Sequence, residues 1–191
     1  MHRFLPVVLA LSLIPITAFG FGYGDVTGGG GSFDTTSLDN LLADIQGVAD
    51  MYTGYHANLK EAAEYLTKIG AAHGITDIYA SVDSWKDLKN AGAMTKEELE
   101  MAQKVLTLAE KLPENIKICM EEAAGLIPQI ATSMTDIVNE IAANPMGATK
   151  LGKYKDDLSA AQTNLQTIIT EGPPIIEESG KVAAASSTLV L

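Results

Sequence analysis

The sequence predicts an all-α protein, an elongated antiparallel helical bundle of about four long arms with the second arm broken. Two observations predict this class. Apolar residues recur in steps of three and four over most of the chain from residue 38 onward, which is the period of an amphipathic helix. Prolines and glycines interrupt the pattern at intervals that leave room for long helices joined by short turns.

Residues 1–20 have the pattern of a secretory signal peptide. Arg3 gives the n-region a positive charge, and an apolar run follows over residues 4–19. Such a run suits a signal peptide but is short for a membrane span, which needs roughly 20 apolar residues. Small residues at Ala18 and Gly20 predict cleavage after Gly20, and an uncleaved membrane anchor is the alternative. Cleavage would deliver the protein to the periplasm or outside the cell, with no stable membrane span.

Residues 21–35 form the predicted flexible linker, because they include four consecutive glycines, which lose the most backbone entropy on ordering. The chain beyond the leader is strongly acidic. Its 24 aspartates and glutamates stand against 12 lysines, since Arg3 is the only arginine. An acidic surface repels nucleic acid and anionic lipid, so we expect the protein to bind no nucleic acid.

The helical-bundle domain is predicted at residues 36–187 and opens with a helix over residues 38–70. The apolar seam of this helix advances by four and three residues without a break. A second register widens it beyond the seam of a two-stranded coiled coil, which favours a helix inside a multi-helix bundle. The seam consists of Leu38, Leu42, Ile45, Ala49, Tyr52, His56, Leu59, Ala63, Leu66 and Gly70.

The broken second arm is predicted from two shorter segments, residues 76–90 and 96–112. Thr95 and Glu98 have the spacing of a capping box, in which each side chain hydrogen-bonds to the backbone of the other residue. This box is expected to open the second segment. Pro113 is expected to end the arm.

Residues 114–144 predict a third arm that keeps its helical phase across Pro128, so we expect one kinked helix there. The fourth arm is predicted at residues 151–171, where a Gly-Pro-Pro run breaks it. A weaker helix is expected over residues 175–186, and residues 188–191 are expected to be a frayed tail.

No catalytic, metal or cofactor motif passes its spacing test, so the sequence predicts a protein that is not an enzyme and needs no cofactor. The best phosphate-loop match, residues 147–153, is followed by Tyr154 where magnesium binding requires a serine or threonine hydroxyl. Cys119 is the only cysteine and lies on the apolar stripe of its helix. This position favours an inert thiol, and an intermolecular disulfide is the alternative.

We therefore expect a non-catalytic bundle that acts by protein binding or scaffolding. Its partner would be another envelope or extracellular protein, or a second copy of itself. One alternative is a carrier of a lipid or other apolar ligand within the bundle, and another is a membrane-perturbing helical protein. The candidate ligand-lining residues stand out on the apolar faces or at the charge-free kink, and they are Tyr52, Tyr55, His56, Pro128 and Met134.

Overall fold

The computed structural model describes residues 35–79 and 82–191, and within these ranges it confirms the all-α class. The predicted signal peptide and nearly all of the predicted linker fall in residues 1–34, outside the described residues. No helix of the described ranges is both long and apolar enough to cross a membrane. The elements are α1 (Thr36–Ala72), α2 (Val82–Asn90), α3 (Lys96–Ala109), α4 (Leu112–Ala143), the 3-10 turn η1 (Pro145–Gly147) and α5 (Ala148–Val190).

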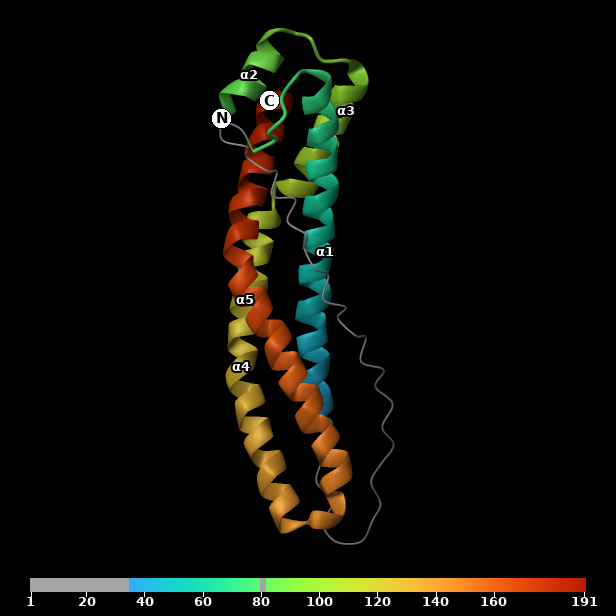
Figure 1. Ribbon diagram of the computed structural model, residues 1–191, viewed down its shortest axis with the longest axis vertical. Helices are drawn as coiled ribbons and strands as arrows, with labels where there is room; N and C mark the ends of the chain where they lie inside the picture. Colours follow the sequence, from blue (N-terminus) through green and yellow to red (C-terminus); the bar gives the residue numbers. More distant parts are fainter. Residues whose placement is uncertain (1–34, 80–81) are drawn as a thin grey trace, which may run out of the picture.

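Within the described residues the long helices form three arms and not the predicted four, namely α1, α3 followed by α4, and α5 (Figure 1). Helices α1 and α5 run in one direction, and α3 followed by α4 forms a single return arm in the opposite direction. Each long arm contacts the other two, while the short α2 packs against α5 near the end of the bundle that carries the C-terminus. The molecule is therefore an elongated bundle with α2 at one end.

One helix ends and another begins near Pro113, as predicted, but the prediction that the second helix forms a new arm is wrong. Only two residues separate the end of α3 at Ala109 from the start of α4 at Leu112. Pro113 lies in the first turn of α4, where a backbone N–H would have no intrahelical partner and where the fixed φ of proline suits the helix. The proline thus starts a helix that continues in the direction of α3 (Figure 1).

Helix α5 continues through both prolines of the Gly-Pro-Pro run to Val190. The structure therefore has neither the predicted break nor the frayed tail at residues 188–191. Each internal proline costs roughly 3 kcal/mol in an isolated helix, because it removes a backbone hydrogen bond. Packing outweighs that cost, since Ile168, Ile175 and Val182 are buried at intervals of seven residues across the prolines. In Figure 1 α5 changes direction near its middle, as a proline kink would make it do.

Helix α1 follows the predicted seam most closely in its first half. The seam residues from Leu38 to Tyr52 are buried, but His56 and Ala63 are only partly buried. Ala62 and Ile69, which belong to the second register, are fully buried instead. An α-helix drifts by about 20° per heptad relative to a seven-residue repeat, so the buried face passes from one register to the next along a straight helix.

A hydrogen-bonded corner joins the end of α1 to the start of α3. The predicted capping box is confirmed. Thr95 Oγ1 accepts from the backbone N–H of Glu98 at 3.2 Å, and the Glu98 carboxylate accepts from the backbone N–H of Thr95 at 2.7 Å. His73 Nε2 lies 3.0 Å from Oε1 of the same carboxylate. These hydrogen bonds, led by the one from the Thr95 backbone, lower the pKa of Glu98.

This corner should make the stability of the bundle depend on pH in the acid range. The folded pKa of Glu98 lies below its unfolded value of 4.5, so the carboxylate stabilises the fold above that value and less as the pH falls through the folded pKa. Between about pH 5 and about pH 3, urea unfolding of Glu98→Gln should therefore show a smaller loss of stability than wild type. Glu97→Gln, at the exposed neighbouring position, should behave like wild type. Identical pH profiles for Glu98→Gln and wild type would contradict the prediction.

Candidate functional site

Of the five candidate ligand-lining residues, the structure brings two together. Tyr52 and His56, one turn apart on α1, stack with ring centroids 6.1 Å apart and planes inclined by 20°. Tyr55 on α1 and Met134 on α4 are half-buried, whereas Pro128 is exposed. Because Pro128 faces solvent while Tyr52 is buried in the core, the five side chains do not line one shared interior cavity.

The surroundings of His56 favour the neutral form of its imidazole. Burial lowers the pKa of His56, and the Glu171 carboxylate partly opposes this effect, so the imidazole is neutral at pH 7. Within residues 35–79 and 82–191, no group of three or more His, Cys, Asp and Glu side chains is placed to hold a metal ion. His56 therefore packs as a neutral ring against Tyr52.

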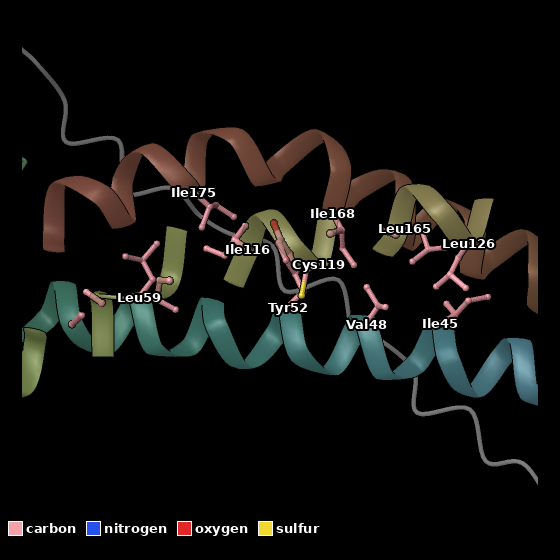
Figure 2. Close-up of a cluster of buried hydrophobic side chains, with 14 of the residues drawn as sticks. Ile45, Val48, Tyr52, Leu59, Ile116, Cys119, Leu126, Leu165, Ile168 and Ile175 are labelled. Carbon is pink, nitrogen blue, oxygen red and sulfur yellow. The ribbon is translucent and has the colours of Figure 1, made fainter. Parts of the chain in front are cut away.

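Tyr52 and Cys119 lie side by side in the core where α1 faces α4 (Figure 2). Cys119 is 1% exposed, and burial, with a contribution from Glu122, raises the pKa of its thiol to about 11. Because the thiolate is the reactive form, this thiol is inert at neutral pH, and its burial keeps it away from a second folded chain. Burial also raises the pKa of Tyr52, whose hydroxyl has no hydrogen-bond partner in the described part of the chain.

Removing the Tyr52 hydroxyl should not destabilise the bundle. A buried hydroxyl without a partner costs about 1–3 kcal/mol, so Tyr52→Phe should leave the free energy of unfolding unchanged or raise it by about 1 kcal/mol. Tyr154→Phe is the matched control, because Tyr154 Oη donates to Asp39 Oδ1 at 2.6 Å and losing this bond should cost about 1–2 kcal/mol. Urea denaturation followed by circular dichroism measures both. A loss above about 1 kcal/mol for Tyr52→Phe would show that its hydroxyl has a partner.

A solvent-open groove of about 450 Å³ runs between α1 and α4 and is the candidate functional site. Its apolar floor includes Val48 and Leu126, which are 4% and 8% exposed and belong to the hydrophobic core. Figure 2 shows both side chains in the core between α1 and the helices opposite it, near Ile45 and Leu165. The groove is lined by Ala43, Asp44, Gly47, Val48 and Met51 from α1 and by Glu122, Gly125, Leu126 and Gln129 from α4.

Two glycines keep this groove open. Gly47 on α1 and Gly125 on α4 are exposed, and a Cβ atom added to either would meet no described atom within 4 Å. On each helix the lining residues beside the glycine lie three residues before it and four residues after it, so they share one helix face. The two faces thus form walls that carry side chains at their ends and bare backbone in the middle.

The walls of the groove are acidic. Asp44 lies on the α1 wall and Glu122 on the α4 wall. Neighbouring charged residues are partnered, since Glu121 pairs with Lys117 at 3.8 Å and Asp50 accepts from Gln46 at 2.7 Å. Asp44 and Glu122 make no ion pair or hydrogen bond with a side chain of the described ranges. Both carboxylates are therefore available to a positively charged group from outside the chain.

None of the five candidate ligand-lining residues lines the groove. Gly125 lies three residues before the candidate Pro128, but neither Gly125 nor Gly47 was predicted to line a site. A usable signal was present, since each of the two glycines follows an acidic residue by three positions on a helix face. The groove itself depends on which helices pack side by side, and that contact is long-range.

Comparisons with protein-family models, curated proteins and solved structures find no match to this chain. A functional interpretation of the groove therefore depends on its own residues.

Proposed function

We propose that this chain is an exported, non-catalytic helical-bundle protein that binds another protein in the cell envelope or outside the cell, through the α1/α4 groove. The observation that carries the proposal is the groove of about 450 Å³, with its apolar floor and two unpartnered carboxylates. Clefts that bind ligands commonly measure roughly 300–1,000 Å³. Both walls belong to long helices whose opposite faces are packed in the core, so the surface is preformed.

A protein partner fits this groove better than a small apolar ligand. Small-molecule sites enclose roughly 70–90% of the ligand surface, whereas this groove is open to solvent. A groove between two helices instead matches the row of side chains that another helix presents. The carrier alternative also lacks support from its candidate residues, because Pro128 and Tyr52 face different environments. The acidic composition speaks against a protein that perturbs anionic membranes.

Photo-crosslinking in the native host tests the proposed binding surface. A photoreactive amino acid at Met51, in the groove, should form a covalent adduct with another protein. The same amino acid at Met146, which is 90% exposed at the turn between α4 and α5, is the matched control and should not. Gly125→Leu, which places a side chain in the groove, should abolish the adduct at position 51. Equal labelling from positions 51 and 146, or labelling that survives Gly125→Leu, would contradict the proposal.

Export is tested by the mass of the mature protein. If the leader is removed after Gly20, intact protein from the native host should begin at Phe21 and be recovered outside the cytoplasm. Mass spectrometry of fractionated cells gives both results. A full-length chain that begins at Met1 and stays with the membrane would instead support the uncleaved anchor.

A further inference from the structure

We propose that the α1/α4 groove accepts one positively charged amphipathic helix of the partner protein, which packs against α1 and α4 as a fourth helix. This inference rests on the proposed function and specifies the chemistry of the partner. Three properties of the groove carry it: its length along the helix axes, its glycine walls and its unpaired negative charge.

The dimensions of the groove match a helix. Its lining spans residues 43–51 on α1 and 122–129 on α4, which corresponds to roughly 10–12 Å at 1.5 Å per residue, or about two helical turns. Side chains three and four residues apart on a partner helix form a ridge of that length. An extended strand would have unpaired backbone groups there, because α1 and α4 satisfy their own backbone hydrogen bonds within the helices.

The glycines allow a partner backbone to come close. Gly47 and Gly125 leave the middle of each wall without a side chain, so a ridge of apolar side chains can reach the floor formed by Val48 and Leu126. Met51 is 39% exposed at one end of the groove. Its flexible thioether side chain can adapt to the shape of an incoming apolar residue.

The negative charge of the groove favours a positively charged partner. Asp44 and Glu122 lie on opposite walls, so lysines or arginines on both sides of an apolar ridge could each meet a carboxylate. The chain as a whole has 24 acidic residues and 13 basic ones, which attracts a cationic partner over longer distances. A second copy that offered the same groove in a two-fold contact would place carboxylate against carboxylate, so a symmetric dimer is disfavoured.

Synthetic peptides test the chemistry directly. The probe is a fluorescein-labelled helical peptide of about five turns, roughly 18 residues, with leucine and alanine on one face and lysines at the flanking positions. Fluorescence anisotropy with the full chain is measured at about 0.15 M salt. The lysine peptide should bind, and a peptide with glutamate in place of every lysine should not. A scrambled lysine peptide without an apolar face should bind about tenfold more weakly or worse.

A side chain that fills the groove should weaken peptide binding without destabilising the fold. Gly125→Leu should weaken binding of the lysine peptide by about tenfold or more, because the new side chain occupies the space that the apolar ridge of the peptide needs. The same change should raise the urea midpoint, since glycine is a poorer helix former than leucine. Gly152→Leu on α5 is the matched control, because a Cβ there also meets no described atom within 4 Å and the site lies outside the groove. It should leave peptide binding unchanged.

Neutralising the walls tests the charge. Asp44→Asn combined with Glu122→Gln should weaken binding several-fold, on the order of threefold to tenfold, and should reduce its dependence on salt. Glu110→Gln combined with Asp156→Asn removes the same charge from exposed positions outside the groove and should have a smaller effect. Equal losses from the two double variants would mean that only the net charge matters, and they would overturn the inference.

The remaining outcomes distinguish this inference from the proposed function. If the glutamate peptide or the scrambled peptide binds as well as the lysine peptide, the basic amphipathic helix is the wrong partner. The proposed function then still stands if the adduct at position 51 depends on Gly125. If no such adduct forms in the host, the proposed function fails whatever the peptides do. Self-association that Gly125→Leu abolishes would identify a second copy as the occupant and overturn the inference.

Discussion

Replacement of Trp85 by alanine is expected to lower the free energy of unfolding by about 3–5 kcal/mol, the range measured for truncation of large buried aromatic side chains. Trp85 is the only tryptophan of the chain and is fully buried. It belongs to the nine-residue helix α2, which packs on α5, and its Cη2 atom would lie 3.5 Å from a Cβ added to Gly70 of α1. One side chain thus connects α2 to two long arms.

The loss of protection from hydrogen exchange should be largest in α2. Urea unfolding followed by circular dichroism measures the free energy, and hydrogen exchange should show faster exchange over residues 82–90 in Trp85→Ala. Trp85→Phe is the control, since it keeps most of the apolar contact and removes an indole N–H that has no partner among the described residues. It should cost less than about 1.5 kcal/mol. A loss below about 1 kcal/mol for Trp85→Ala would show that α2 contributes little to the fold.

Replacement of Gly172 by leucine is expected to destabilise the bundle by about 2–3 kcal/mol, at the upper end of typical overpacking effects. Gly172 is buried on α5, and a Cβ there would lie 2.2 Å from Sδ and 2.7 Å from Cγ of Met120 on α4. The methionine side chain fills the space that any larger residue would need. Gly172 also precedes Pro173, and a residue with a Cβ is disfavoured in helical geometry before proline.

A matched substitution in the same helix provides the control. Gly180→Leu on α5 introduces the same side chain where no described atom lies within 4 Å of the new Cβ, so it should stabilise the bundle by about 0.5–1 kcal/mol. Met120→Ala combined with Gly172→Leu should recover part of the loss, because it removes the atoms that clash. Similar effects of leucine at positions 172 and 180 would contradict the close contact between α4 and α5.

The helices were predictable from the sequence to the extent that local signals decide them. The seam from Leu38 to Tyr52 and the capping box at Thr95 follow from residue spacing and side-chain hydrogen bonding within a few residues, and both are confirmed. The number of arms was not predictable in this way. Pro113 can end one helix or occupy the first turn of the next. The outcome depends on how α3 and α4 pack against α1 and α5, and these contacts are long-range.

The continuity of α5 shows the same limit. A Gly-Pro-Pro run breaks an isolated helix, but burial of Ile168 and Ile175 on either side of it keeps the helix intact. The groove was also beyond local reasoning. Gly47 and Gly125 are visible as exposed glycines on their own helices, yet 78 positions of sequence separate them, and only the packing of α1 on α4 makes them opposite walls.

The length of α1 has a consequence for how this protein can change. Gly47 in the groove and Gly70 beside Trp85 are separated by about 35 Å of helix at 1.5 Å per residue. Substitutions at such distances, with no shared neighbours, usually have additive effects on free energy. Stability can therefore be adjusted at the α2 end while the affinity of the groove is left intact, and binding can be altered at the groove without a penalty at the other end.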